Sequence, residues 1–284
     1  MMLDGLGFPE ALRWRDGALW FSDMFRSRVM RWVPGSEPSV VIDGAGGGPT
    51  VPGGLGWLPD GSLLVVDCTE RRVLRAHDGV VSVHADLAEL MTHSANDMHV
   101  DPDGTAWVGG YGFDPESDAP VPSALVRVDP DGTLSTTAAT FVFPNGCERD
   151  ATGALLVAET FADRVSLMSP DDAVTPRARF EPGSGPDGLS VAPDGTVYVA
   201  LAFAGALARL APVEAGPDAP AEHVYRAEPL ASGPGAGPLG VYDCAVHPDG
   251  RSIAVAMASL DEALAERVDT GRVVLLDLAS PALP

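Results

Sequence analysis

A tight turn followed by a short apolar strand recurs six times along the chain, and this repeat limits the possible folds more than any other feature. Each copy begins with Asp-Gly or Thr-Gly and continues with alternating apolar residues, as β-hairpins do. The copies are DGALWFSD from Asp16, DGSLLVVD from Asp60, DGTAWVGG from Asp103, TGALLVAE from Thr152, DGTVYVAL from Asp194 and DGRSIAVA from Asp249. They start 44, 43, 49, 42 and 55 residues apart, and one four-stranded propeller blade takes roughly 40–50 residues.

The repeat predicts an all-β protein, a six-bladed β-propeller with four-stranded antiparallel blades that forms a single domain over residues 1–284. A solenoid is the main structural alternative. Solenoids usually have a tighter period and distinct caps, whereas the six units here nearly fill the chain, as a closed ring requires.

Three stretches interrupt the pattern. Residues 86–93 (DLAELMTH) and 259–269 (SLDEALAERVD) have helical apolar spacing, which predicts helices in loops between strands. The Pro- and Gly-rich stretch 211–238 is predicted to be a long connection before the last blade.

Charge and cysteine content restrict the partners. The net charge of −22, from 40 acidic and 18 basic residues, makes nucleic acid and anionic membrane surfaces unfavourable partners.

Cys68, Cys147 and Cys244 lack the paired spacing of a zinc site or a disulfide framework, so buried free thiols are expected. No stretch approaches the roughly 18 apolar residues of a membrane helix. We therefore expect a soluble, cytoplasmic protein.

The innermost strands of a propeller line its channel, so residues at one repeated position converge on the axis. Seven residues before each turn stand Pro9, Gly53, Asn96, Asn145, Asp187 and Tyr242, and Glu10 stands one step later. Pro-Asn-Gly at Pro144 and Pro-Asp-Gly at Pro186 are also ordinary turn sequences. Turns alone do not explain why Glu10 and Asn96 recur near the same level in two other blades.

Carboxylate and amide oxygens are the ligands that hard cations prefer. Glu10, Asn96, Asn145 and Asp187 therefore predict one divalent metal ion, with calcium favoured and zinc, manganese or magnesium as alternatives. Two carboxylates neutralise the ion, and water or a substrate oxygen would complete its ligands.

These residues carry a resemblance to the family of senescence marker protein, gluconolactonase and luciferin-regenerating enzyme, also called regucalcin-like. The matching motifs are LGFPEALRW from Leu6, NDMHVDPDGTAWVGG from Asn96, PNG from Pro144 and GPDGLSVAPDG from Gly185. The resemblance implies a six-bladed propeller in which Glu10, Asn145 and Asp187 bind the metal and Asn96 contacts metal or substrate. It also implies lactone hydrolysis with Asp187 as the general base.

The sequence departs from the family pattern at one informative position. Members that hydrolyse sugar lactones often have arginine two residues before the Asn-Asp motif, where this chain has Ser94, preceded by His93. A smaller or more apolar lactone is therefore expected. Ser94, His93, Asn96 and Tyr242 are the predicted substrate-binding residues, and His93 or His99 could move a proton or be structural.

The predicted activity is ring opening of a small-molecule lactone or ester to a hydroxy acid, with the metal polarising the carbonyl and Asp187 activating water. Two alternatives remain at this stage. One is a metal-dependent esterase or phosphotriesterase on the same site. The other is a non-catalytic propeller that binds calcium or a protein partner.

Overall fold

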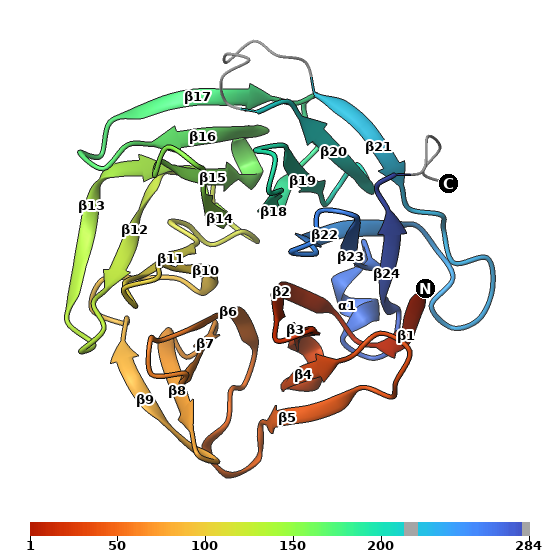
Figure 1. The fold of residues 1–284 in the computed structure, drawn as a ribbon, viewed down its shortest axis with the longest axis horizontal. Coiled ribbons are helices and arrows are strands. Elements are labelled where there is room, and N and C mark those ends of the chain that lie inside the picture. Colours follow the sequence, from red (N-terminus) through yellow and green to blue (C-terminus); the bar gives the residue numbers. More distant parts are fainter. Residues whose placement is uncertain (213–220, 280–284) are drawn as a thin grey trace.

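The computed structural model describes residues 1–212 and 221–279, which form six four-stranded antiparallel sheets arranged as a ring (Figure 1). The predicted six-bladed propeller is confirmed. Apolar faces of neighbouring blades pack against each other, as where Leu64 and Val66 of the second blade meet Met98 and Val108 of the third. The channel axis lies between the six inner strands.

The strands follow the meander that the repeat predicts. Blade one comprises β2 (Pro9–Arg15), β3 (Ala18–Asp23), β4 (Arg28–Trp32) and β5 (Ser39–Asp43); blade two β6 (Pro52–Trp57), β7 (Leu63–Asp67), β8 (Arg72–His77) and β9 (Val80–Asp86); blade three β10 (Ala95–Val100), β11 (Ala106–Gly110), β12 (Ser123–Val128) and β13 (Leu134–Phe141). Blade four comprises β14 (Pro144–Arg149), β15 (Leu155–Glu159), β16 (Arg164–Met168) and β17 (Val174–Arg179); blade five β18 (Pro186–Val191), β19 (Val197–Leu201), β20 (Ala206–Leu210) and β21 (Glu222–Arg226).

The sixth blade joins the two ends of the chain. It contains β22 (Leu239–Val246), β23 (Ser252–Ser259) and β24 (Gly271–Asp277), and β1 (Met2–Leu6) adds as its outermost strand. Figure 1 shows β1 beside β24. The ring is therefore closed by backbone hydrogen bonds between the first and last strands. The sequence repeat did not reveal this closure, because β1 precedes the first copy.

The short helices correct two predictions. The segment 259–269 contains α1 (Glu262–Ala265), which is shorter than its apolar spacing predicts. The predicted helix over 86–93 is wrong: the segment makes one turn, in which the amide N–H groups of Leu90 and Met91 donate to the carbonyl oxygen of Leu87. Leu87 and Met91 are both buried, so their helical spacing reflects this single turn. The inner strand β10 starts at Ala95 and leaves no room for a longer helix before it.

The stretch 211–238 is more structured than predicted. Its Glu222–Arg226 forms β21, the outer strand of the fifth blade, and the connection to the last blade follows that strand. Residues 213–220 of the same prediction lie outside the described residues. The described residues also contain three 3-10 turns: η1 (Met24–Arg26), η2 (Ala45–Gly47) and η3 (Thr160–Ala162).

Three blades each contain an ion pair between a buried carboxylate at the end of the second strand and an arginine of the third strand. Asp23, Asp67 and Glu159 end β3, β7 and β15, are fully buried, and each pairs with an arginine five residues later. In the second blade, Asp67 Oδ2 accepts from Arg72 at 2.9 Å. Asp67 Oδ1 also accepts from the amide N–H of Thr50 at 2.9 Å, which fixes the segment that leads into the inner strand.

We expect Asp67→Ala to lower the free energy of unfolding by about 2 kcal/mol, because it leaves buried N–H groups and Arg72 without an acceptor. Denaturant unfolding measures the change. Glu37→Ala is the matched control, since Glu37 is exposed and has a negative backbone φ, and a surface change of this kind stays within about 0.5 kcal/mol. Equal effects of the two substitutions would contradict a structural role for the Asp67 carboxylate.

Every inner strand carries a β-bulge near its start. In the fourth blade, Pro144 pairs with Glu159 and Cys147 with Val157, so Asn145 and Gly146 together oppose one residue of β15. A register shift lies at the corresponding place in the other five blades. A bulge re-aims the side chains beside it, so this repeated irregularity defines one layer of residues around the axis.

The structure corrects the register assigned to Glu10. Pro9 pairs with Asp23 at the end of β3, as Pro144 pairs with Glu159 at the end of β15, so Glu10 and Asn145 are equivalent. The count from the turn was one residue off, because the first turn begins seven residues after Pro9 whereas the fourth begins eight after Pro144.

Candidate metal centre and substrate pocket

A cavity of about 530 Å³ lies at the end of the channel where the inner strands begin. Glu10, Asn96, Asn145 and Asp187, from blades one, three, four and five, all line it. Asn145 and Asp187 are almost fully buried, whereas Glu10 and Asn96 are half-buried. Four oxygen-bearing side chains that are far apart in the sequence thus share one pocket.

Hydrogen bonds fix the two amides. The side-chain amide nitrogen of Asn96 donates to Oδ1 of Asn145 at 2.9 Å. The amide nitrogen of Asn145 donates to Thr160 Oγ1 at 3.2 Å. Because each amide nitrogen is used as a donor, the oxygen of Asn145 faces Asn96 across the pocket floor, and the two side chains hold one orientation.

Asp187 carries a buried polar atom of this floor that lacks a partner. Its Oδ1 is buried, and within the described residues no donor reaches it. A buried carboxylate oxygen without a hydrogen bond is costly, so this atom is suited to accept a bond from a ligand, a cation or a proton.

The surroundings of the pocket floor disfavour the ionised form of both its carboxyl groups, Glu10 and Asp187. Burial raises the pKa of Glu10, and the charges of Asp187 and Asp243 raise it further. Burial also raises the pKa of Asp187, followed by the charges of Asp243 and Asp97. A cation between the two carboxylates would relieve both effects, because opposite charge favours the ionised form.

Among the other predicted residues, Ser94 and Tyr242 line the same pocket. The Tyr242 hydroxyl donates to the carbonyl oxygen of Ser259 at 3.1 Å, so this residue presents its ring to the pocket. His93 lies in an adjoining cavity of about 360 Å³ that shares Ser94 with the pocket. His99 faces the opposite end of the channel, where it contacts Asp101 at 3.2 Å.

Four further aromatic side chains of the pocket lining were not predicted from the sequence. Tyr111, Phe143, Phe161 and Phe203 form what we call the aromatic wall: Tyr111 stacks on Phe143 with ring centroids 3.8 Å apart, and Phe161 lies between Phe143 at 5.6 Å and Phe203 at 6.0 Å. A sequence signal existed, since Phe161 and Phe203 each stand two residues after the second strand of their blade, as Phe25 does.

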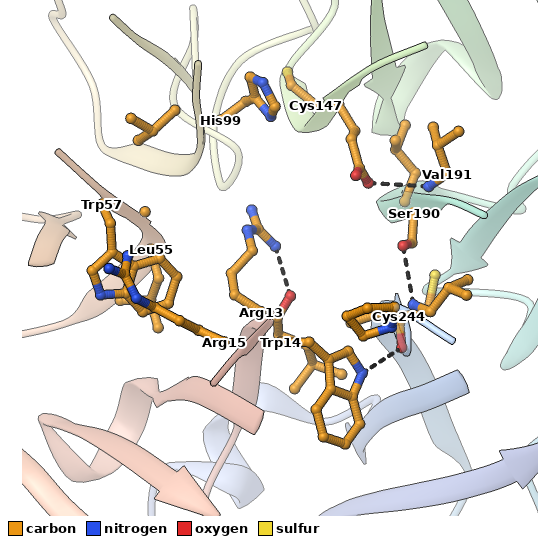
Figure 2. Close-up of a pocket in the computed structure, with 18 of the residues that line it drawn as sticks. Arg13, Trp14, Arg15, Leu55, Trp57, His99, Cys147, Ser190, Val191 and Cys244 are labelled. Carbon is orange, nitrogen blue, oxygen red and sulfur yellow. Dashed lines mark hydrogen bonds between the residues drawn. The ribbon is translucent and has the colours of Figure 1, made fainter. Parts of the chain in front are cut away.

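A second cavity, of about 620 Å³, lies at the other end of the channel, where the inner strands end (Figure 2). Its polar groups are largely bonded to one another or to the backbone. Asp101, for example, is held by Arg149, His99 and Trp107, and these donors keep the pKa of that carboxyl well below its usual range although burial opposes them.

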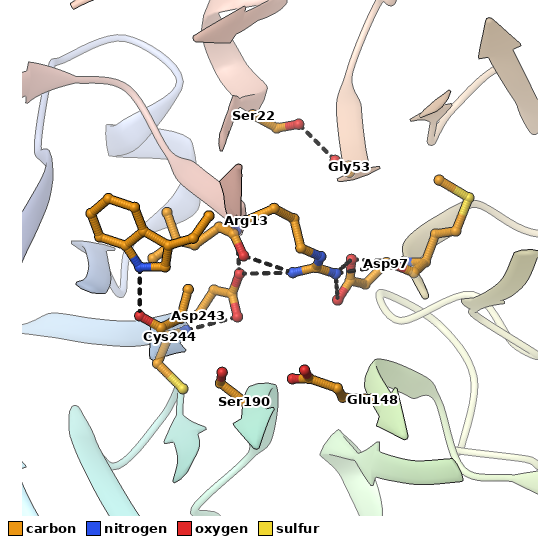
Figure 3. A network of polar contacts seen from close by, with 12 residues as sticks. Arg13, Ser22, Gly53, Asp97, Glu148, Ser190, Asp243 and Cys244 are labelled. Carbon is orange, nitrogen blue, oxygen red and sulfur yellow. Dashed lines mark hydrogen bonds and ion pairs between the residues drawn. The ribbon is translucent and has the colours of Figure 1, made fainter. Parts of the chain in front are cut away.

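Arg13, Asp97 and Asp243 form an ion-pair network (Figure 3). Arg13 lines the second cavity, and Asp97 and Asp243 directly follow Asn96 and Tyr242 of the first, so the network lies between the two. The Arg13 guanidinium donates to Asp97 at 3.1 Å and lies 3.7 Å from Asp243. Asp243 also accepts from the amide N–H groups of Leu12 and Cys244, so it connects the sixth blade to the first. Gly188 is required beside it, because an added Cβ would lie 1.8 Å from Asp243 Oδ1.

Over residues 1–212 and 221–279 no group of three or more His, Cys, Asp or Glu side chains is placed to hold a metal; the pocket floor offers two carboxylates and two amides. Within the same ranges no helix is long and apolar enough to cross a membrane. The three cysteines are buried and free, as predicted.

Residues 8–217 match the model described as the SMP-30/gluconolactonase/LRE-like region. The chain therefore belongs to the SMP-30/gluconolactonase/LRE-like family.

Individual relatives are more distant. A virginiamycin B lyase of Nocardia farcinica (strain IFM 10152) is 31% identical over 185 residues, which are 65% of this chain and 60% of that protein's length. Among solved structures, a luciferin-regenerating enzyme aligns with a TM-score of 0.75 at 17% identity, covering 99% of this chain and 95% of the other. The calcium-binding protein regucalcin of Agrobacterium tumefaciens aligns with a TM-score of 0.71 at 16% identity, covering 99% and 94%. At such identities the structural likeness concerns the fold.

Proposed function

We propose that the protein is a metal-dependent hydrolase that opens a lactone ring to a hydroxy acid. The observation that carries the proposal is the convergence of Glu10, Asn96, Asn145 and Asp187 on one pocket floor with Asp187 Oδ1 left without a partner. Membership of a family that includes gluconolactonase supports the lactone.

The floor fits a hard divalent cation, which the donor set itself indicates. Glu10, Asn145 and Asp187 would hold it through carboxylate and amide oxygens, with Asn96 beside them, and calcium is the ion that such oxygens favour. The elevated pKa values of Glu10 and Asp187 mark two carboxyls that lack a positive partner. When bound, the ion supplies charge neutralisation and Lewis acidity toward a carbonyl oxygen.

The chain's own groups have separable tasks in this mechanism. Asp187 accepts the proton of the attacking water, for which its buried Oδ1 is free. The Asn96 and Asn145 amides orient the ester group, because their mutual hydrogen bond and the bond to Thr160 fix both side chains. Glu10 mainly contributes negative charge that retains the cation.

The test is ring opening of a lactone panel by protein stripped of metal and then reconstituted with calcium, zinc, manganese or magnesium. The proposal expects turnover with at least one ion and none after chelation. Equal turnover in excess chelator would overturn metal dependence. Tight metal binding without turnover of any lactone would favour a calcium-binding propeller instead.

A lyase is the second candidate, supported by the 31% identical virginiamycin B lyase. Hydrolysis and elimination differ in the origin of the product oxygen. Reaction in ¹⁸O-labelled water places the label in the new carboxylate only if water attacks the carbonyl. An unlabelled product that contains a new double bond would identify a lyase and contradict the role given to Asp187.

Ser94 offers a prediction about specificity. We expect Ser94→Arg to raise kcat/KM for a hydroxylated sugar lactone relative to an aliphatic lactone by about tenfold, since one good hydrogen bond to a charged donor is worth roughly 1.5 kcal/mol or more. Steady-state kinetics on both substrates measure the ratio. Thr69→Ser at the same pocket is the control, and an unchanged ratio in a folded, metal-binding Ser94→Arg protein would contradict the prediction.

A further inference from the structure

We propose that the pocket selects uncharged lactones that carry an aromatic or alkyl substituent, and that the aromatic wall holds that substituent beside the pocket floor. This inference rests on the proposed lactone hydrolysis. It goes beyond that activity by stating which lactones the pocket accepts and which it rejects.

The aromatic wall provides the apolar surface. Phe161 and Phe203 are 37% and 44% exposed, yet both line the pocket. Large exposed aromatic side chains beside a buried polar floor are typical of a binding surface. Phe161 is held in place by Phe113, whose ring lies edge-on at 5.4 Å and is itself buried, so the wall is organised without a ligand.

The wall adjoins the reacting groups. Phe143 directly precedes Pro144 and Asn145, and Phe161 directly follows Thr160, the hydrogen-bond partner of Asn145. A substituent on the wall therefore places its lactone ring near the amides and Asp187. Flat rings suit this surface, because aromatic groups stack on one another with offset or edge-on geometry.

The charge of the pocket rejects anions. Of the described residues that line it, none is Lys, Arg or His, whereas Glu116 and Glu262 add two exposed carboxylates to those of Glu10 and Asp187. A divalent cation would balance the floor and leave the mouth negative. Arg71 lies in the adjoining cavity, but its guanidinium donates to the carbonyl oxygens of Met91 and Thr92.

Few side-chain hydroxyl groups of the pocket are free to bond to sugar hydroxyls, and the carboxylates of its floor and mouth accept hydrogen bonds without donating any. Two of its five hydroxyl side chains are in internal hydrogen bonds: Thr160 accepts from Asn145, and Tyr242 donates to Ser259. Thr69, Ser94 and the Tyr111 hydroxyl remain. Burying the several hydroxyls of a sugar lactone against aromatic rings would leave them unsatisfied, which costs binding free energy. Apolar substituents meet no such penalty.

The experiment compares γ-phenyl-, γ-hydroxymethyl- and γ-carboxy-γ-butyrolactone with wild-type protein and the Phe161→Ala/Phe203→Ala double variant. We expect the double variant to lower kcat/KM for the phenyl lactone about tenfold and to change that for the hydroxymethyl lactone less than about twofold. Val83→Ala, an exposed apolar change on the outer strand β9, should alter neither value. An equal loss for both lactones would overturn the proposal, as would a preference for the carboxylated compound.

Binding of the corresponding γ-lactams, which resist hydrolysis, separates this inference from the proposed function. Calorimetry should show the phenyl lactam binding the metal-loaded protein at least about tenfold more tightly than the hydroxymethyl lactam, and the double variant should remove the difference. If no lactone is turned over but this order holds, the hydrolase proposal fails and the pocket inference stands. If the lactams bind equally, the pocket inference fails whether or not lactones are hydrolysed.

Discussion

Replacing Asp187 by asparagine is expected to lower turnover at saturating metal by about 10²–10⁴-fold, the usual contribution of a general base. The amide keeps one carbonyl oxygen as a possible ligand but cannot accept the proton from water. Loss of one negative charge weakens metal binding as well, so the assay uses excess metal and direct metal analysis confirms occupancy.

Glu266→Gln removes the same charge from an exposed position just after α1, outside the pocket lining. Its turnover should stay within about twofold of the wild type. Near-normal turnover of a metal-saturated Asp187→Asn protein would leave Asp187 with no role beyond that of a ligand, and His93 in the adjoining cavity would become a candidate for the base.

Replacing Arg13 by methionine is expected to lower the free energy of unfolding by about 3 kcal/mol at pH 8, because it leaves Asp97 and Asp243 buried without their positive partner. Denaturant unfolding of the metal-free protein measures the loss. Arg15→Met is the matched control: Arg15 pairs with Asp16, whose side chain is 88% exposed, so its loss should be about 1 kcal/mol or less.

The Arg13→Met penalty should grow with pH. Burial raises the pKa of Asp243 to about 7, against the opposing charge of Arg13, and removing Arg13 raises it further. A carboxyl whose pKa is higher in the folded than in the unfolded state contributes stability that is present below about pH 4 and is lost as the pH rises through the folded-state value. The difference between variant and wild type should therefore be smaller at pH 5 than at pH 8, and the reverse order would contradict the account.

The fold was predictable because each blade repeats the same local signal. An Asp-Gly or Thr-Gly turn between alternating strands specifies a hairpin, and blades built from six such hairpins bury their apolar faces against one another when they form a ring. The closure by β1 was not predictable in this way, since that strand has no turn of its own and pairs with β24 at the far end of the chain. The prediction of a helix over 86–93 was wrong because Leu87 and Met91 satisfy helical spacing within one turn.

The sequence repeat predicted that the four residues of the pocket floor converge, although only the strand pairing in the structure fixed the register of Glu10. One residue fewer before the first turn shifts every count made from that turn, whereas strand pairing fixes Glu10 opposite Ser22 directly. The aromatic wall was missed because the positions compared were those before each turn, whereas Phe161 and Phe203 follow the second strand of their blades. The Arg13 network was missed because a search for like residues at like positions does not reveal partners of opposite charge such as Arg13 and Asp243.

The most direct test of the central proposal is a titration of metal-stripped protein with calcium while ring opening of an apolar lactone is followed by proton release. Activity is expected to rise linearly and to reach its plateau at one ion per chain, and Glu10→Gln is expected to shift the titration to higher calcium concentrations without abolishing the plateau. Full activity in the stripped protein, or a plateau at one bound ion without any proton release, would contradict it.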